Sequence, residues 1–163
     1  MKITTLDADE YFHLALHASS VSDPHASISY LEEVLQRQPA HARALYLRAV
    51  QHAELGLTER AIKGIREALA IEPALEIARF HLGLLLLFDR NCSAETKGHL
   101  VELGGSSDHH LRKYAEVLAA LVDERITPAV PDDGPLGLLV KRLVEHLSGG
   151  MRPETVGKDL SHD

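Results

Sequence analysis

Histidines are the residues of this sequence whose type and spacing come closest to a catalytic or metal-binding pattern. The 163-residue chain contains 11 of them, and His13 and His17 are four residues apart. On a helix this spacing puts two imidazoles on one face, where they could bind a metal ion. No third ligand follows at a definite spacing, and two ligands leave a metal site incomplete. We therefore expect neither a metal nor another cofactor.

Other signatures of catalysis are missing from the sequence. It contains no nucleophile elbow, phosphate-binding loop, pair of catalytic carboxylates or zinc signature. Its single cysteine, Cys92, cannot form a disulfide within the chain, which fits a reducing compartment. No signal peptide is visible, and the longest apolar run, residues 82–88, is too short to span a bilayer. These features predict a cytoplasmic protein that is not an enzyme, with a histidine- or metal-dependent enzyme or enzyme regulator as the remote alternative.

The charge of the chain argues against nucleic acid as a partner. The formal net charge is −7 at pH 7, whereas nucleic-acid-binding surfaces need clustered Lys and Arg on one face. A short basic stripe is formed by Arg60, Lys63 and Arg66, but Glu59 and Glu67 flank it. We interpret the stripe as a solvated outer face, because scattered surface charge is normal.

The chain repeats itself with a period of 34 residues. This shift brings Pro39 onto Pro73. It also superimposes one row of aromatic residues and, four positions further on, one row of aliphatic residues: Phe12, Tyr46, Phe80 and Tyr114, then Leu16, Val50, Leu84 and Leu118. Two rows that share one period indicate an internal repeat.

The clearest copy of the repeat is residues 42–73. Its motif consists of an AxALY opening at residues 42–46, Leu55-Gly56, Ala61, Ala68-Leu69 and the closing Pro73. This pattern resembles the tetratricopeptide repeat (TPR). The resemblance is good for residues 42–73, fair for 8–39 and partial for 76–107, and residues 110–123 resemble one more first helix. It implies an all-α fold, a right-handed superhelix of antiparallel helix pairs.

Capping residues and prolines predict where the helices begin and end. Asp7 followed by Glu10 has the pattern of a capping box, Asp23 precedes Pro24, and Ser107-Asp108 can cap a seventh helix. The expected helices span 8–19, 24 to the proline at 39, 41–55, 58–71, 74–88, 93–103 and 109–125. We expect residues 1–126 to form the repeat domain and 127–135 a Pro-rich linker. A separate amphipathic helix is expected at 136–148 and a disordered tail at 149–163. The apolar side of that helix comprises Leu136, Leu139, Val140, Leu143, Val144 and Leu147.

In the TPR fold the first helix of each pair lines the concave wall. The resemblance therefore implies a groove made by Phe12, Leu16, Tyr46, Val50, Ala53, Phe80, Leu84, Leu87, Tyr114 and Leu118, with His13 and His81 at its flanks. If half of the aromatic area stayed exposed, the groove would show roughly 300–500 Å² of apolar surface. Protonation of the two histidines below about pH 6.5 could then weaken an apolar grip. The alternative is that the aromatic rings simply stack on the next repeat.

An apolar groove predicts a binding module, an adaptor or chaperone that holds an apolar helix or extended segment of a partner protein. The alternative is a self-associating assembly subunit, such as a homodimer, whose groove is filled by residues 136–148 of its own or a twin chain. Some co-chaperones of the TPR family bind a C-terminal carboxylate through Lys, Asn and Arg side chains on the first helices of their repeats. The matching positions here carry Phe12, Leu16, Leu47, Ile77 and His81, so we exclude a carboxylate clamp.

Overall fold

The fold is a row of α-helices, seen here in a computed structural model that describes residues 5–88 and 94–122. Seven α-helices and one short 3-10 helix occupy these residues, with no strand among them. Their bounds are α1 Ala8–Ser20, α2 Pro24–Arg37, α3 Ala42–Glu54, α4 Thr58–Ile71, α5 Glu76–Phe88, α6 Ala94–Glu102, η1 Leu103–Gly105 and α7 His109–Val122. The predicted linker, the 136–148 helix and the tail lie outside the described residues, as does Cys92.

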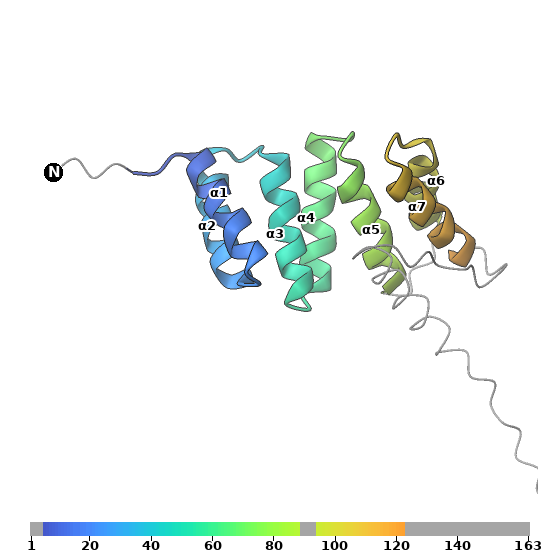
Figure 1. The fold of residues 1–163 in the computed structure, drawn as a ribbon, viewed down its shortest axis with the longest axis horizontal. Helices are drawn as coiled ribbons and strands as arrows, with labels where there is room; N and C mark the ends of the chain where they lie inside the picture. The colour runs from blue at the N-terminus through green and yellow to red at the C-terminus, as the bar shows by residue number, and fades with distance from the viewer. Residues whose placement is uncertain (1–4, 89–93, 123–163) are drawn as a thin grey trace, which may run out of the picture.

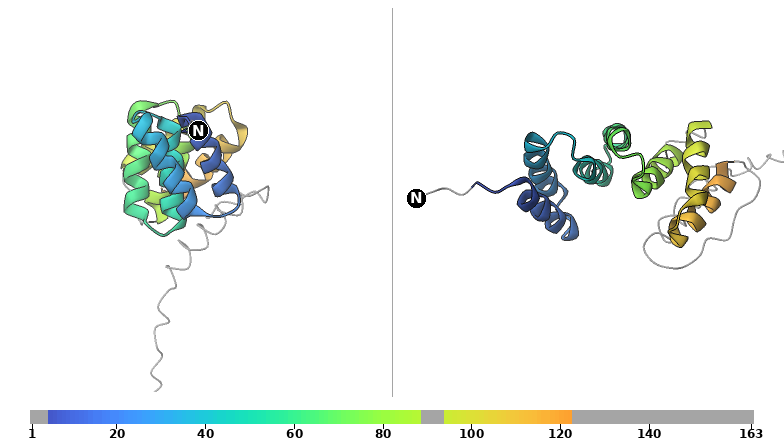
Figure 2. Two further views of the ribbon diagram at one scale, coloured as in Figure 1. Left: turned by 90° about the vertical axis from the view of Figure 1, so that its left-hand side faces the viewer. Right: turned by 90° about the horizontal axis from the view of Figure 1, so that it is seen from above.

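Consecutive helices form hairpins that stack side by side along the row (Figure 1). The most extensive contacts are those of α1 with α2 and of α3 with α4, and each hairpin then packs against the next. Seen from above, α1, α3, α5 and α7 lie on one side of the row and α2, α4 and α6 on the other (Figure 2). We call the first side the inner face and the second the outer face. This arrangement confirms the all-helical solenoid that the repeat predicts.

The helix ends follow from local hydrogen bonding. The carboxylate of Asp7 accepts from the backbone N–H of Glu10 at 2.9 Å, and the Glu10 carboxylate accepts from the N–H of Asp7 at 2.8 Å. Asp23 likewise accepts from the N–H of Ala26 at 3.0 Å, with Pro24 in the first turn of α2. Each carboxylate satisfies a backbone donor that has no partner within the helix. The capping box and the Asp23 cap are thus confirmed.

The starts of α5 and α7 show details that are not predicted from the sequence. The third first helix begins at Glu76 instead of residue 74, because Leu75 closes a turn by donating to the carbonyl of Glu72 at 3.1 Å. Before α7, Asp108 accepts from the N–H of His110 and of Leu111, as predicted. The serine that participates is Ser106, whose hydroxyl donates to the Glu76 carboxylate at 2.6 Å and so joins the α7 start to α5.

Small residues let the helices of the second hairpin approach closely. Ala44, Ala49, Ala61 and Ala68 are all buried, with Ala44 in the cluster that α3 shares with α1 and α2. A Cβ atom added at Gly64 of α4 would lie only 2.9 Å from the Cβ of Ala49 on α3. At the turn between the two helices Gly56 adopts φ +74°, a left-handed conformation that favours glycine. The small residues therefore set the spacing of this hairpin, and Gly56 sets its turn.

Candidate functional site

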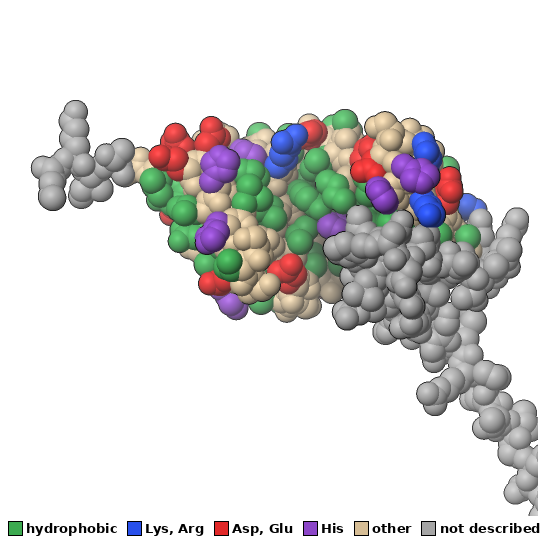
Figure 3. Space-filling view, in the orientation of Figure 1, with side chains coloured by type: hydrophobic (Ala, Val, Ile, Leu, Met, Phe, Trp, Pro, Cys, Tyr) green, Lys and Arg blue, Asp and Glu red, His purple; other side chains and the backbone are tan. Residues whose placement is uncertain are grey.

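The N-terminal part of the inner face exposes apolar side chains. Leu16 on α1 is 43% exposed, and Phe12 on α1 and Tyr46, Val50 and Ala53 on α3 are partly exposed. Figure 3 looks onto this face and shows hydrophobic side chains gathered over α1 and α3, with histidines among them. We call these five residues the open patch. They are the part of the predicted groove that a partner could contact directly.

The rest of the predicted groove lies in the interior. Phe80, Leu84 and Leu87 of α5 and Tyr114 and Leu118 of α7 are each at most 2% exposed. They form one cluster with Leu100, Leu103, Leu111 and Ala115, so α5, α6, η1 and α7 pack around them. A partner bound to this arrangement of the chain would not touch these five residues. Their apolar character is accounted for by packing.

A hydrogen bond joins the two parts of the inner face. The hydroxyl of Tyr46 lies 2.7 Å from Nδ1 of His81, and the two rings stack with centroids 5.6 Å apart. Burial lowers the pKa of His81 to about 4 and raises that of Tyr46 above its ordinary value. His81 therefore stays neutral at mildly acid pH, contrary to the prediction that it would protonate below about pH 6.5. His13, which occupies the equivalent repeat position, is exposed to solvent.

A second histidine, His41, contacts Phe12 of the open patch. His41 Nδ1 accepts a hydrogen bond from the backbone N–H of Ala44 at 3.1 Å and so caps α3. Its ring lies against Phe12 with centroids 5.0 Å apart. Phe12 on α1 is thereby held against the start of α3. This capping role is not predicted from the sequence, in which His41 is the first residue of the expected helix 41–55, whereas α3 begins one residue later, at Ala42.

The helical architecture has close structural counterparts. The fragment of MamA from residue 41 to its end, from Desulfovibrio magneticus RS-1, matches with a TM-score of 0.64 and 19% identity over 87% of this chain and 76% of that one. The TPR2B domain of yeast Sti1, in its complex with pHsp70, matches with a TM-score of 0.58 and 18% identity over 88% of this chain and 97% of that domain. The chain has the tetratricopeptide-repeat fold. At these identities the likeness concerns the TPR fold alone.

Relatives found by sequence cover less of the chain. The human protein named "FK506-binding protein-like" is 34% identical over 74 residues, which is 45% of this chain and 21% of that protein. Its mouse counterpart is 32% identical over 84 residues, which is 52% of this chain and 24% of that protein. The chain thus spans about a fifth to a quarter of the length of these curated relatives. No protein-family model matches the chain.

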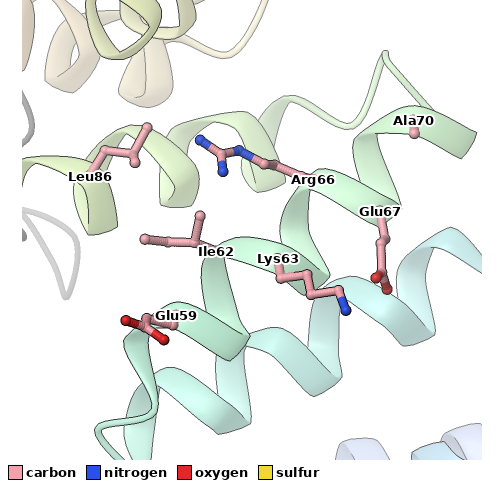
Figure 4. A pocket seen from close by; sticks show the side chains of 7 residues that line it. All are labelled: Glu59, Ile62, Lys63, Arg66, Glu67, Ala70 and Leu86. Carbon is pink, nitrogen blue, oxygen red and sulfur yellow. The ribbon is translucent and has the colours of Figure 1, made fainter. Parts of the chain in front are cut away.

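The outer face of the TPR row carries a hollow of about 560 Å³ beside α4. Figure 4 shows its lining, which comprises Glu59, Ile62, Lys63, Arg66, Glu67 and Ala70 of α4 with Leu86 of α5. Arg66 is already engaged, because its guanidinium donates to the Glu95 carboxylate of α6 at 2.8 Å. Two acidic and two basic side chains share the rim, so the hollow selects neither sign of charge. This agrees with the interpretation of the basic stripe as a solvated outer face.

The part of the chain that the structure describes contains neither a metal-binding cluster nor a membrane-spanning helix. Among residues 5–88 and 94–122, no group of three or more His, Cys, Asp or Glu side chains is arranged to hold a metal ion. His13 and His17 are both exposed on α1. No helix in the described part of the chain is long and apolar enough to cross a bilayer.

Proposed function

We propose that the chain is a non-catalytic protein-interaction module, a cytoplasmic adaptor or chaperone. In this proposal its open patch binds an apolar helix or an extended apolar segment of a partner protein. The observation that carries the proposal is the run of exposed and partly exposed apolar side chains from Phe12 to Ala53 on one side of two adjacent helices. Removing apolar surface from water stabilises a complex by about 25 cal/mol per Å², so binding a partner with a matching apolar side is favourable at this patch.

The chemistry of the inner face favours an apolar partner over a charged tail. The family positions that would grip a carboxylate are occupied by Phe12, Leu16, Leu47, Ile77 and His81. His81 is largely buried, bonded to Tyr46 and neutral at physiological pH, so it supplies no fixed positive charge. The structural likeness to the TPR2B domain of Sti1 concerns the fold alone, and we propose an apolar segment of a protein as the ligand of this chain.

Site-specific photo-crosslinking in the source cell tests the proposal. A photoreactive amino acid placed at Val50, in the open patch, should give an adduct that mass spectrometry maps to an apolar segment of another protein. The matched control carries the same amino acid at Val101, which is 58% exposed on α6 and outside the open patch. The Val101 probe should not give that adduct.

A second substitution makes the test specific to the patch. Leu16→Asp puts a charge into the open patch at an already exposed position, so it should reduce the Val50 adduct at least tenfold while the helical signal in circular dichroism is unchanged. Identical adducts from the Val50 and Val101 probes would count against the proposal. An adduct confined to a twin copy of this chain would favour the assembly subunit instead.

A further inference from the structure

We infer that the open patch is covered in the free chain by residues 136–148 of the same chain, which compete with the partner and must be displaced by it. This inference rests on the proposed function, since it names how the same surface is regulated. The inference assigns a single occupant to the open patch, namely residues 136–148, which belong to the same chain as the patch.

The sequence of residues 136–148 predicts a helix with a single apolar side. Six of its seven large aliphatic residues are Leu136 and the residues at spacings of three, four, seven, eight and eleven from it, which share one face of an α-helix, and Leu138 lies off that face. The intervening positions carry Gly137 and Leu138 in the first turn and then Lys141, Arg142, Glu145 and His146. A helix of this kind is stable in water only when its apolar side packs against another apolar surface.

The open patch is the surface in the described fold that answers this need. Its five residues lie together on α1 and α3, with Leu16 the most exposed of them. The other exposed large aliphatic residues are distributed along the chain, on α1, in the α1–α2 turn, just before α4, at the end of α4 and on α6: Leu14, Val21, Leu57, Ile71 and Val101. Inner-face residues of α5 and α7 are already packed in their own cluster. The open patch therefore offers an apolar helix several exposed and partly exposed apolar side chains on two helices of the inner face.

The tether is long enough for the segment to reach the patch. The described part of α7 ends at Val122, so 13 residues separate it from Leu136, and such a stretch spans up to about 45 Å when extended. Packed helices lie about 8–10 Å apart, and α3 connects to α7 through the packed pairs α3–α4, α4–α5 and α5–α7, so α3 lies at most about 30 Å from α7, within the reach of the extended stretch. A helix of 13 residues is itself about 20 Å long, which matches the width of two inner helices.

Tethering also favours this occupant over a second copy. A short flexible linker gives an effective concentration of the order of millimolar. A twin chain would have to reach a comparable concentration to replace the tethered segment. We therefore assign the patch to the segment of the same chain, and a dimer becomes an outcome that the experiment can detect.

Fluorescence anisotropy with a labelled peptide of residues 134–150 tests the inference on the full-length chain. Leu139→Asp with Leu143→Asp puts charges on the apolar side of the tethered segment and should release it. The doubly substituted chain should then bind the free peptide at least tenfold more tightly than the unaltered chain. Adding Val50→Asp should abolish that gain. Arg142→Asp, which places the same charge on the polar side, should bind the peptide as weakly as the unaltered chain does.

Three outcomes would overturn the inference. Equal peptide binding by the unaltered chain and by the Leu139→Asp, Leu143→Asp chain means that the patch is not covered. Absence of peptide binding by every variant, with the Val50 adduct to another protein still present, removes the internal competitor and leaves the proposed function standing. A concentration-dependent dimer that dissociates on Leu139→Asp and Leu143→Asp assigns the segment to a twin chain.

Failure of the proposed function has a different signature. In that case the Val50 probe gives no adduct to another protein even in the Leu139→Asp, Leu143→Asp chain, whatever the peptide does. Circular dichroism of every variant confirms that the helices are retained, and Val101→Asp serves as a control for an added charge on an exposed valine elsewhere.

Discussion

The Tyr46 hydroxyl and the His81 imidazole form a hydrogen bond of 2.7 Å that ties α3 to α5. Burial lowers the pKa of His81 to about 4 and raises the pKa of Tyr46, so both groups are neutral at physiological pH. Because neither group carries a charge, this hydrogen bond is compatible with the apolar character of the open patch, to which Tyr46 belongs. It also fixes how the fold responds to acid.

Acid should destabilise the fold through His81. Its pKa is about 4 in the folded chain and about 6.5 in the unfolded chain, so the unfolded chain binds the proton first as pH falls. The stabilisation from neutral His81 is complete above pH 6.5 and is lost between pH 6.5 and pH 4. The free energy of unfolding should drop by about 2 kcal/mol from pH 7.5 to pH 5. Urea unfolding followed by circular dichroism at the two pH values measures it.

Other histidines act in the same direction, and a matched pair of variants separates them. Burial also lowers the pKa of His52 and of His99. Replacing His81 and Tyr46 together by Phe removes both partners of the hydrogen bond and should reduce the acid effect by most of its size. His13→Gln, at the exposed equivalent position, should leave the acid effect intact. An acid effect of the same size in both variants would show that His81 is not its source.

The sequence predicts the fold well because the helix boundaries depend on interactions between residues that are close in the sequence. Asp7, Asp23 and Asp108 mark helix starts through caps that need only neighbouring residues. In the structure, the small residues Ala49 and Gly64 lie where α3 and α4 approach each other closely. Helix type, order and approximate bounds therefore follow from the chain itself.

Exposure along the inner face does not follow from the repeat. Leu16 and Leu84 hold the same repeat position, yet one is 43% and the other 2% exposed. The difference arises because Leu84 belongs to the cluster that α6, η1 and α7 complete, whereas Leu16 is on the first helix of the row. Tyr46 and His81 are 35 residues apart, one more than the period, so their bond comes from the packing of neighbouring hairpins. An equivalent position in the repeat therefore predicts where a residue lies on its helix, but it does not predict which residues pack against it.

Gly64→Ala should destabilise the chain despite the better helix propensity of alanine. The new Cβ would meet the Ala49 Cβ at 2.9 Å, which forces α3 and α4 apart. Overpacking of this kind costs about 1–3 kcal/mol, against a propensity gain of about 1 kcal/mol. Urea unfolding should therefore show a net loss of stability. Gly98→Ala on α6 is the matched control, because a Cβ there meets nothing within 4 Å. It should stabilise the chain by about 0.5–1 kcal/mol, and a loss at Gly98 equal to that at Gly64 would refute the steric explanation.

Removing the Asp23 cap should cost about 1 kcal/mol. Asp23→Ala leaves the N–H of Ala26 without its side-chain acceptor at the start of α2. Asp7→Ala should have a similar effect at α1, where the capping box is lost. Asp9→Ala is the control, since Asp9 is an exposed acidic residue in the first turn without a capping hydrogen bond, and its effect should stay within about 0.5 kcal/mol. Thermal and urea unfolding rank the three variants, and an equal loss at Asp9 would assign the effect to charge alone.

Leu84→Ala and Leu16→Ala should separate packing from binding at one repeat position. Leu84 is buried among Phe80, Leu87 and Leu118, so its truncation leaves a cavity and should cost about 2–5 kcal/mol of unfolding free energy. Leu16 is 43% exposed, and its truncation should cost less than about 1 kcal/mol. If the open patch binds a partner, Leu16→Ala should instead weaken the Val50 photo-adduct at unchanged stability. A large loss of stability at Leu16 would place this side chain in the core and leave the inner face without its most exposed contact.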